Sequence, residues 1–271
     1  MHPTRESILL ASLSRTCKAL EFGALDRPLI NKREFSVKYV DFTNREDLAL
    51  RLRNVSSVDL TKLVEVDLIW GSDRIAEALG EHQPLDFILA SHVFEHLPNP
   101  LGWLEVLESL LSNHGRISLA IPDKRFTFDY ERPVTRVSEW LASKMENRSF
   151  PPIHLALEAV LYFSPVETQQ AWQSNYPKRK LLEPTEFEHY RGLAEGVLLN
   201  GTYHDVHCSI FTPHSFVELM LESAYYGLHQ YSYSNFVPTR LGDMEFFVEL
   251  ITCDSRQQQL IQWSKLAAQL A

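Results

Sequence analysis

The sequence is poor in cysteine and has no long apolar run. Its three cysteines, Cys17, Cys208 and Cys253, are odd in number and lack CxxC spacing, which argues against a disulfide framework or a cysteine zinc site. No apolar stretch approaches the roughly 20 residues that a membrane-spanning helix needs. Residues 1–5 also lack the apolar segment of a signal peptide. We therefore expect a cytoplasmic protein that has no membrane partner.

An excess of positive charge is also missing. The chain has 26 Lys and Arg residues against 35 Asp and Glu residues, a formal net charge of -9. Repulsion from phosphates removes the attraction that supplies most non-specific affinity for nucleic acid, and the compact basic run at 178–180 is expected to be a solvated loop. We expect no nucleic-acid partner. A length of 271 residues suits one α/β core with an insertion.

Residues 85–123 predict the central unit of an α/β fold. The apolar run 87–90 shows no polar alternation, which is typical of a strand buried on both faces of a parallel sheet. Leucines then recur at helical spacing over 101–111, and Gly115 is expected to end that helix. Apolar residues alternate again over 117–121 and indicate the next buried strand. The order of strand, loop, helix and strand predicts one right-handed βαβ crossover.

A known family shares this pattern. Four polar residues follow the strand predicted at 87–90, at the end where open α/β sheets bind ligands. They are Ser91, His92, Glu95 and His96. The run Asp86-Phe87-Ile88, Val93-Phe94-Glu95-His96-Leu97, Pro98-Asn99-Pro100, a leucine-rich helix, Gly115 and Ile121-Pro122 resembles the segment from the fourth to the fifth strand of class I S-adenosylmethionine-dependent methyltransferases. The resemblance implies S-adenosylmethionine as the cofactor and a Rossmann-like, doubly wound, seven-stranded sheet with a C-terminal antiparallel hairpin. One departure is Asn113-His114-Gly115 in place of the usual Pro-Gly-Gly.

The first predicted strand, 18–23, ends in Glu21, Phe22 and Gly23. A tight glycine turn at this point lets the backbone approach a nucleotide. The family usually has three glycines here, whereas this chain keeps only Gly23. The segment 23–29 also resembles a subgroup in which Gly-Pro-Leu-Asp-x-Pro-Leu replaces the glycine-rich loop, except that Ala24 stands in place of the proline. The resemblance implies that Glu21 and Gly23 meet the cofactor.

Asp41 ends the second predicted strand, 36–41, and stands 18 residues after Gly23. An acidic residue about 20 residues beyond the glycine turn binds the ribose hydroxyls in this architecture. We therefore predict that Asp41 binds the ribose. The alternative is that Asp41 caps the helix expected over 45–53.

The third strand is predicted over 64–70. The resemblance places five more residues beside the cofactor, with Trp70, Gly71 and Ser72 at the adenine and Ala90 and Ser91 at the methionine end. Trp70 has an alternative role as an aromatic residue of the core.

Residues 123–208 are far longer than an ordinary connection between strands, and long insertions of this kind are often lids or binding elements. We predict that they form a substrate-covering insertion within one domain that spans 1–271, with helices over 137–145 and 153–161. The chain then returns to the fold with a helix up to Tyr226, strands over 228–234 and 245–252, and a closing helix over 257–270.

Methyl transfer from a sulfonium is mainly a matter of positioning, but an alcohol acceptor also needs a base, and histidine has a suitable pKa. We favour His204 or His207 as this base, and His92 is a third candidate. The alternatives are that these histidines only form hydrogen bonds, or that His204, Asp205, His207 and His154 bind a metal. We do not favour the metal, because nothing in the sequence fixes the geometry of these groups.

Charged residues just beyond the strand predicted over 117–121, the fifth of the fold, are candidates for binding the substrate. Asp123, Arg125 and Arg132 lie there, and a guanidinium binds carboxylates and phosphates bidentately. The alternative is that the arginines pair within the protein with Asp123, Asp129 or Glu131.

The sequence as a whole favours a methyltransferase that acts on an oxygen of a small molecule, such as a sugar or secondary metabolite. Two alternatives remain open: methylation of a small amine, or a binding or scaffold protein that keeps the cofactor fold without catalysis. The oligomeric state is also open, with a homodimer among the options.

Overall fold

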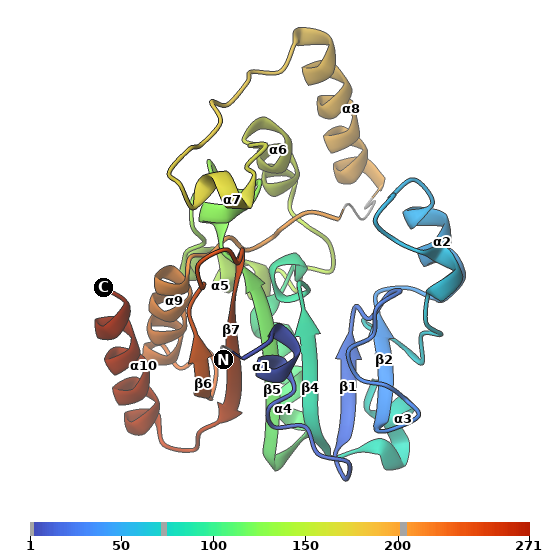
Figure 1. The fold of residues 1–271 in the computed structure, drawn as a ribbon, viewed down its shortest axis with the longest axis vertical. Coiled ribbons are helices and arrows are strands. Elements are labelled where there is room, and N and C mark those ends of the chain that lie inside the picture. Colours follow the sequence, from blue (N-terminus) through green and yellow to red (C-terminus); the bar gives the residue numbers. More distant parts are fainter. Residues whose placement is uncertain (1–2, 72–74, 201–204) are drawn as a thin grey trace.

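The fold is described from a computed structural model over residues 3–71, 75–200 and 205–271. Two predicted site residues, Ser72 and His204, lie outside these ranges. Within the ranges, strands and helices alternate along the first half of the chain (Figure 1). The strands are β1 (Lys18–Phe22), β2 (Ser36–Asp41), β3 (Leu68–Ile69), β4 (Leu85–Ser91), β5 (Leu111–Pro122), β6 (Tyr231–Val237) and β7 (Glu245–Thr252).

The described strands form one seven-stranded sheet in the order β3-β2-β1-β4-β5-β7-β6. The first five strands in this order pair in parallel, and β7 pairs antiparallel with both β5 and β6. The predicted doubly wound sheet with a C-terminal antiparallel hairpin is therefore confirmed.

The helices expected over 45–53, 137–145, 153–161 and 257–270 and the helix up to Tyr226 lie close to their predicted positions, whereas the helices over 168–171 and 184–200 were not predicted. The described part of the chain contains ten α-helices. They are α1 (Arg5–Leu9), α2 (Arg45–Leu52), α3 (Ile75–Leu79), α4 (Pro100–Leu110), α5 (Val137–Met145), α6 (Ile153–Leu161), α7 (Thr168–Ala171), α8 (Pro184–Asn200), α9 (Pro213–Tyr225) and α10 (Arg256–Leu270). Their first turns follow local rules: Asn99 accepts a hydrogen bond from Gly102 N at 2.9 Å, and Thr212 accepts one from Ser215 N at 3.1 Å. These contacts satisfy amide groups that a helix start leaves unpaired.

Two predicted boundaries are wrong. The helix expected to continue to Gly115 ends at Leu110, because the chain turns at Leu111 to pair with Leu85. Gly115 instead lies in β5, where an added Cβ would come within 2.8 Å of the Leu85 carbonyl. The third strand is only two residues long, since the Asp67 carboxylate takes the Tyr39 N–H at 2.6 Å and interrupts the ladder there.

The core covers both faces of the sheet, as the apolar run in β4 predicts. Phe87 and Leu89 pack on one face, and Ile88 and Ala90 pack on the other, all with no exposed surface. The leucines of α4 complete the second face together with Trp140 of α5. The middle of the sheet is therefore rigid, and residues just beyond the strand ends have fixed positions.

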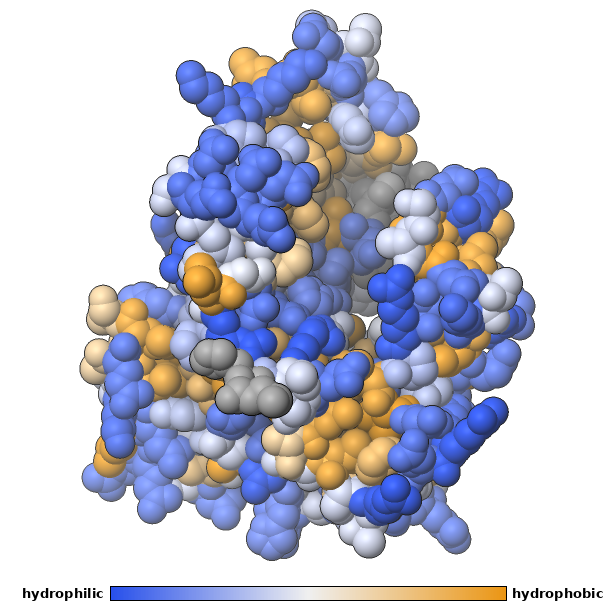
Figure 2. Space-filling view, in the orientation of Figure 1, coloured by the Kyte–Doolittle hydropathy of each residue, from blue (hydrophilic) through white to orange (hydrophobic). Residues whose placement is uncertain are grey.

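Most of residues 123–208 lies at the carboxyl ends of the parallel strands. Figure 1 shows α6, α7 and α8 at the top of the molecule, beyond the ends of β4 and β5. The space-filling view shows the surface hollowed between this part and the α2 region at the right (Figure 2). Among the described helices, none has the length and apolar character that crossing a membrane requires.

Candidate active site

Three residues predicted to meet the cofactor lie at the ends of three adjacent strands. Phe22 of β1 stands opposite Val40 of β2 on one side and Ala90 of β4 on the other. The residues that follow these positions are Gly23, Asp41 and Ser91. They therefore share one edge of the sheet, the edge where open α/β sheets bind ligands.

The turn after β1 is tight although it has a single glycine. Gly23 has a φ of +64° and donates its N–H to the Val40 carbonyl at 3.0 Å. A Cβ at Gly23 would lie 2.8 Å from Cγ2 of Val93. Leu25 also has a positive φ, +47°, which is uncommon and costly for a branched side chain and is typical of functional sites.

Replacing Gly23 with alanine is expected to weaken S-adenosylhomocysteine binding about tenfold or more, because a side chain there is strained and displaces Val93. Calorimetry would measure the affinity. Gly242→Ala is the matched control: Gly242 also has a positive φ, +88°, but nothing lies within 4 Å of its added Cβ. Equal loss of affinity in both variants would contradict a specific role for the Gly23 turn.

Glu21 supports the loop that follows this turn. Its two carboxylate oxygens accept the N–H groups of Leu29 and Ile30 at 2.7 and 2.8 Å. The side chain is buried, and burial raises the pKa of Glu21 to about 7 despite these hydrogen bonds. Glu21 thus shapes the 23–30 loop from inside, and its oxygens are already occupied.

Asp41 is held at the end of β2 with one oxygen in use. Its Oδ1 accepts the N–H of Phe42 at 2.8 Å. Burial, with a smaller contribution from the negative charge of Asp205, raises the pKa of Asp41 to about 6. The helix-cap alternative is not what the structure shows, because the cap of α2 is Asn44, which accepts the Asp47 N–H at 2.9 Å.

The residues predicted to flank the adenine and the methionine end differ in their surroundings. Trp70 packs edge-on against Phe22 at 5.3 Å between ring centroids and lies 6.3 Å from Trp103, so it belongs with the core aromatics, the alternative considered above. Gly71 follows with a φ of +87°. The Ala90 side chain is fully buried, which leaves only its backbone to meet a ligand.

An ion-pair network lies at the end of β4. Arg5 donates to both Glu245 oxygens, at 2.6 and 3.1 Å, and to Ser91 Oγ at 2.5 Å. His92 Nε2 lies 2.8 Å from Glu245, and its Nδ1 lies 3.4 Å from Glu95. Burial opposes charge on His92, but its contacts with Glu245 and Glu95 outweigh it and raise the pKa of His92 to about 9. A proton-accepting role for His92 would require one of these contacts to break.

A second polar cluster contains His207. Its Nδ1 pairs with Asp129, whose other oxygen accepts a hydrogen bond from Arg132 at 2.8 Å. Its ring stands perpendicular to that of His96, with the centroids 4.6 Å apart. His96 Nδ1 in turn lies 2.8 Å from Asp205. The edge of the sheet after β4 thus carries several imidazoles, each beside a carboxylate.

Backbone hydrogen bonds explain why His207 lies over the loop that follows β4. The carbonyl of Glu95 accepts the N–H groups of Cys208 and Ser209 at 2.6 and 3.0 Å. The segment is also fixed on its other side, where Trp140 donates its indole N–H to Ser209 at 2.9 Å. Residues more than a hundred positions apart are therefore locked together.

The charged residues after β5 pair within the protein. Arg125 binds Asp123 through two nitrogens at 2.6 to 3.1 Å, and Thr239 donates to the same carboxylate at 2.8 Å. Arg132 has 1% of its surface exposed, and it binds Asp129 and the His207 carbonyl. The assignment of Asp123 and Arg132 to the substrate is corrected here in favour of the intramolecular pairs, because both side chains are buried and occupied. Arg125 pairs with Asp123 but has 49% of its side chain exposed, and its role towards the substrate stays a prediction.

Four site residues were not identified from the sequence in the roles that they have in the structure: Arg5, Glu95, Glu245 and Asp129. Signals were available for two of them. Glu245 begins a largely apolar, buried strand, where an unpaired carboxylate would be costly. Asp129 also had a local signal, its pairing with Arg132 three residues on, but not its contact with His207, 78 residues away. For Arg5 no local signal exists, because its partner Glu245 is 240 residues away.

The strand order, and the edge of the sheet that carries Gly23, Asp41 and Ser91, are those expected of a class I methyltransferase. A model of the family described as a methyltransferase domain matches residues 18–230, and the chain belongs to that family. This confirms the resemblance to class I S-adenosylmethionine-dependent methyltransferases. No curated protein sequence matches this chain.

Similar solved structures have low sequence identity to this chain. One is a Rhodobacter sphaeroides protein described as a zinc-dependent alcohol dehydrogenase, with 18% identity over 93% of this chain and 91% of that chain, at a TM-score of 0.47. Another is the CcbJ methyltransferase from Streptomyces caelestis, with 11% identity over 92% and 89% and a TM-score of 0.40. A third is the glycopeptide N-methyltransferase MtfA in complex with sinefungin, with 12% identity over 89% of both chains and a TM-score of 0.40.

Proposed function

We propose that this protein transfers the methyl group of S-adenosylmethionine to an oxygen of a small molecule such as a sugar or secondary metabolite. The observation that carries the proposal is the meeting of Gly23, Asp41 and Ser91 at one edge of the sheet, beside the cluster that contains His207. A cofactor placed along this edge would present its methyl group to that cluster.

The chain offers a partner for each end of the cofactor. Asp41 accepts the ribose hydroxyls with the oxygen that Phe42 leaves available. The backbone at Gly23 lies against the amino-acid part, as a tight turn without a Cβ allows. Ser91 and Arg5 stand at the methionine end, where a guanidinium favours a carboxylate.

The chemistry is an in-line displacement. The acceptor oxygen forms a bond to the methyl carbon while the bond from that carbon to sulfur breaks, and S-adenosylhomocysteine leaves as a neutral thioether. The hydroxyl proton must go to a base. We assign the removal of this proton to His207, because Asp129 holds Nδ1 of its ring and thereby leaves Nε2 with a lone pair.

The acceptor is proposed to bind under residues 123–208, acting as a lid. A cavity of about 310 Å³ lies between parts of this segment and Met244, within the size range of small-molecule sites. It is lined by Phe126, Thr127, Phe128, Phe163, Ser164, Pro165, Val166, Glu167, Thr168 and Met244. Phe128 connects this cavity to the base, since its ring centroid is 4.9 Å from that of His207. The mainly apolar lining suits an acceptor that has an apolar part.

Binding of the demethylated cofactor tests the proposal at its first step. Calorimetry with S-adenosylhomocysteine is expected to give one site per chain, and a panel of hydroxylated and amine acceptors with labelled S-adenosylmethionine then identifies the atom methylated. Transfer to amines alone would replace the oxygen assignment with N-methylation. Absence of cofactor binding would contradict the proposed enzymatic function and would favour a binding or scaffold protein.

Cofactor affinity is expected to fall as the pH drops through about 6. The pKa of Asp41 is raised to about 6, and only the ionised carboxylate accepts from both ribose hydroxyls. Affinity should be constant above about pH 7 and should decrease towards tenfold per pH unit below 6. Calorimetry across this range would measure it. Asp41→Asn retains Glu21, which also titrates near 7, so the same pH dependence in that variant would contradict the assignment to Asp41.

We place this reaction in the cytoplasm. The three cysteines Cys17, Cys208 and Cys253 are free thiols, which fits a reducing compartment.

A further inference from the structure

The cluster beside the cofactor edge contains three residues arranged like metal ligands. Glu95, His96 and His207 each offer one ligand atom, and these atoms lie within 4.8 Å of one another. Glu95 and His96 come from the turn after β4, and His207 comes from the segment that the Glu95 carbonyl holds in place. The backbone thus fixes the relative positions of all three residues.

Glu95 is the group that the surrounding protein leaves unsatisfied. Its side chain has no exposed surface, yet neither carboxylate oxygen accepts a hydrogen bond from any group in the described ranges. A buried carboxylate without hydrogen bonds is costly and calls for an explanation, an ion among them. The nearest positive groups are His92 at 3.4 Å and His96 at 3.9 Å.

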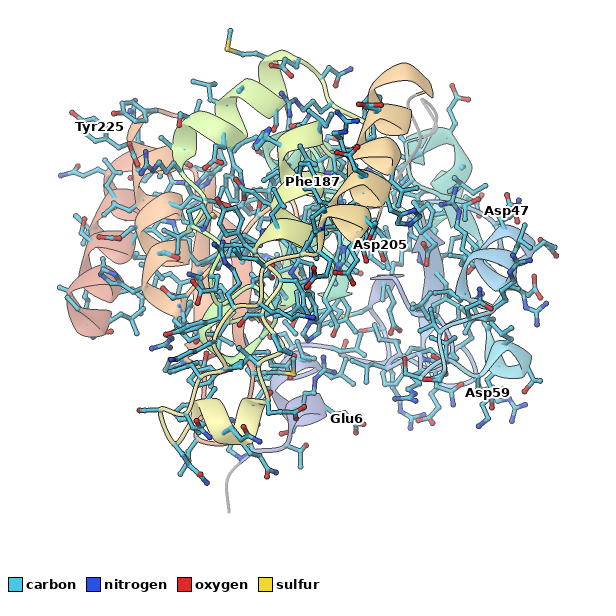
Figure 3. The ribbon with its side chains drawn as sticks, turned by 90° about the horizontal axis from the view of Figure 1, so that it is seen from above. Glu6, Asp47, Asp59, Phe187, Asp205 and Tyr225 are labelled. Atoms are coloured by element: carbon cyan, nitrogen blue, oxygen red, sulfur yellow. The ribbon has the colours of Figure 1, made fainter. Side chains whose placement is uncertain are left out.

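Both imidazoles have the outer partners that metal ligands have in proteins. His207 Nδ1 pairs with the buried carboxylate of Asp129, and His96 Nδ1 lies 2.8 Å from Asp205. A carboxylate that is hydrogen-bonded to Nδ1 fixes the tautomer, orients the ring and leaves Nε2 as the electron-pair donor, as in carboxylate–histidine–metal arrangements. Asp129 does this for His207, whereas Asp205 lies beside Nδ1 of His96 without a hydrogen bond. Seen from above, Asp205 lies over the central part of the molecule, beside α8, whereas Asp47 and Tyr225 lie at the periphery (Figure 3).

We propose that Glu95, His96 and His207 bind one divalent transition-metal ion. Two imidazole nitrogens and one carboxylate oxygen suit zinc, iron(II), cobalt(II) or nickel(II), and they do not suit magnesium or calcium, which prefer sets of oxygen ligands. Three protein ligands leave coordination positions for water or for an oxygen of the acceptor. An ion here would satisfy the Glu95 carboxylate that the protein leaves without hydrogen bonds.

The competing explanation is a network of ion pairs without metal. Burial opposes ionisation of Glu95, but the close contact with His92 and the charges of His92, His96 and His207 outweigh it and lower the pKa of Glu95. In that case His96 and His207 would only balance charge. The two explanations differ in what happens when a metal is offered to the protein.

His207 has a role both in the proposed metal site and in the proposed methyl transfer. Metal binding itself does not rest on methyl transfer. Without metal, the His207 ring takes the hydroxyl proton. With an ion bound, that nitrogen would be a ligand, the cation would lower the pKa of a coordinated hydroxyl, and the proton would pass to solvent water. His207 is needed in both states, and only the second state responds to a chelator.

Titration of the full chain tests the site. The protein is treated with a chelator, exchanged into metal-free buffer and titrated with Zn²⁺ and Mg²⁺ by calorimetry and with Co²⁺ by visible absorption. We expect one Zn²⁺ per chain, a cobalt spectrum typical of nitrogen and oxygen ligands, and no binding of Mg²⁺. Glu95→Gln, His96→Gln and His207→Ala should each lose stoichiometric Zn²⁺ binding. His214→Asn, at a half-buried histidine in the first turn of α9, should retain it.

The outer carboxylates provide a matched pair of variants. Asp129→Asn is expected to weaken zinc binding about 10-fold to 100-fold. Asp205→Asn should have a smaller effect, because the Asp205 side chain is 70% exposed while that of Asp129 is 3% exposed, and solvent screens an exposed charge. Equal effects would contradict the assigned ligand geometry.

Absence of zinc binding by the chelator-treated chain would overturn the proposal. So would zinc binding that survives all three ligand substitutions. Where Glu95→Gln fails to fold, His96→Gln decides, because His96 lies at the surface of the cluster with 25% of its side chain exposed. S-adenosylhomocysteine binding is measured on the same preparations. Zinc binding without cofactor binding would contradict the proposed methyltransferase function and support the metal site. Cofactor binding without zinc binding would contradict the metal site alone.

Discussion

Replacing His207 with alanine is expected to lower turnover by about 10²-fold to 10⁴-fold, the usual contribution of a group that removes a proton in the transition state. The reason is geometric. Asp129 fixes Nδ1 of the ring and the Glu95 carbonyl fixes the following residues, so Nε2 is the nitrogen left for the acceptor or for an ion that binds the acceptor. Steady-state kinetics with labelled S-adenosylmethionine would measure the loss.

Cofactor affinity separates this role from a structural one. S-adenosylhomocysteine binding should be unchanged in His207→Ala, because the residues proposed to hold the cofactor lie on β1, β2 and β4. His214→Asn is the control with normal turnover. If His207→Ala retains full turnover, or loses turnover and cofactor binding together, the assignment of the hydroxyl proton to His207 fails.

Replacing Asp41 with alanine is expected to weaken S-adenosylhomocysteine binding by about 100-fold or more. Asp41 is proposed to accept two ribose hydroxyls, and each hydrogen bond to a charged group contributes about 1.5–3 kcal/mol. Its position at the end of β2 is fixed by pairing with Ile69 of β3 and by the bond to Phe42. Calorimetry at pH 7.5, above the pKa of about 6 for Asp41, would measure the loss.

The matched control is Asp47→Ala. Asp47 is an exposed carboxylate six residues further on, in the first turn of α2, and it lies at the periphery in the view from above (Figure 3). This variant should bind the cofactor as the unchanged protein does. A loss of affinity of similar size in both variants would indicate that the region is perturbed as a whole, and the ribose assignment would fall.

Some features of this site are local and were therefore readable from the sequence. The apolar run of β4, the helical spacing of the leucines in α4 and the alternation in β5 each depend on neighbouring residues only, so the central crossover was predicted closely. The position of Asp41 at the end of the second strand was predicted in the same way, because the distance along the chain between the glycine turn and that strand end is set by one βαβ unit; its ribose contact stays a prediction.

Other features failed because they depend on distant partners. The helix after β4 ends at Leu110 because Leu111 pairs with Leu85. Helix propensity, which depends on neighbouring residues, does not predict such a contact. Arg132 looked like an anion-binding side chain, yet Asp129 and the carbonyl of His207 enclose it. Whether a charged residue faces a ligand or the interior is decided by where the rest of the chain passes, since burial and pairing depend on that path.

By itself the sequence determined the α/β architecture, the order of its elements and the strand ends at which Gly23, Asp41 and Ser91 stand, because periodicity and strand length act within a few residues. Only the tertiary structure decided which polar groups meet. It brought His207 to Asp129 and over Glu95 and His96, and it joined Arg5 to Glu245 across nearly the whole chain. The physical reason is that hydrogen bonds and ion pairs act over a few ångströms in space, and the folded path of the backbone alone sets those distances.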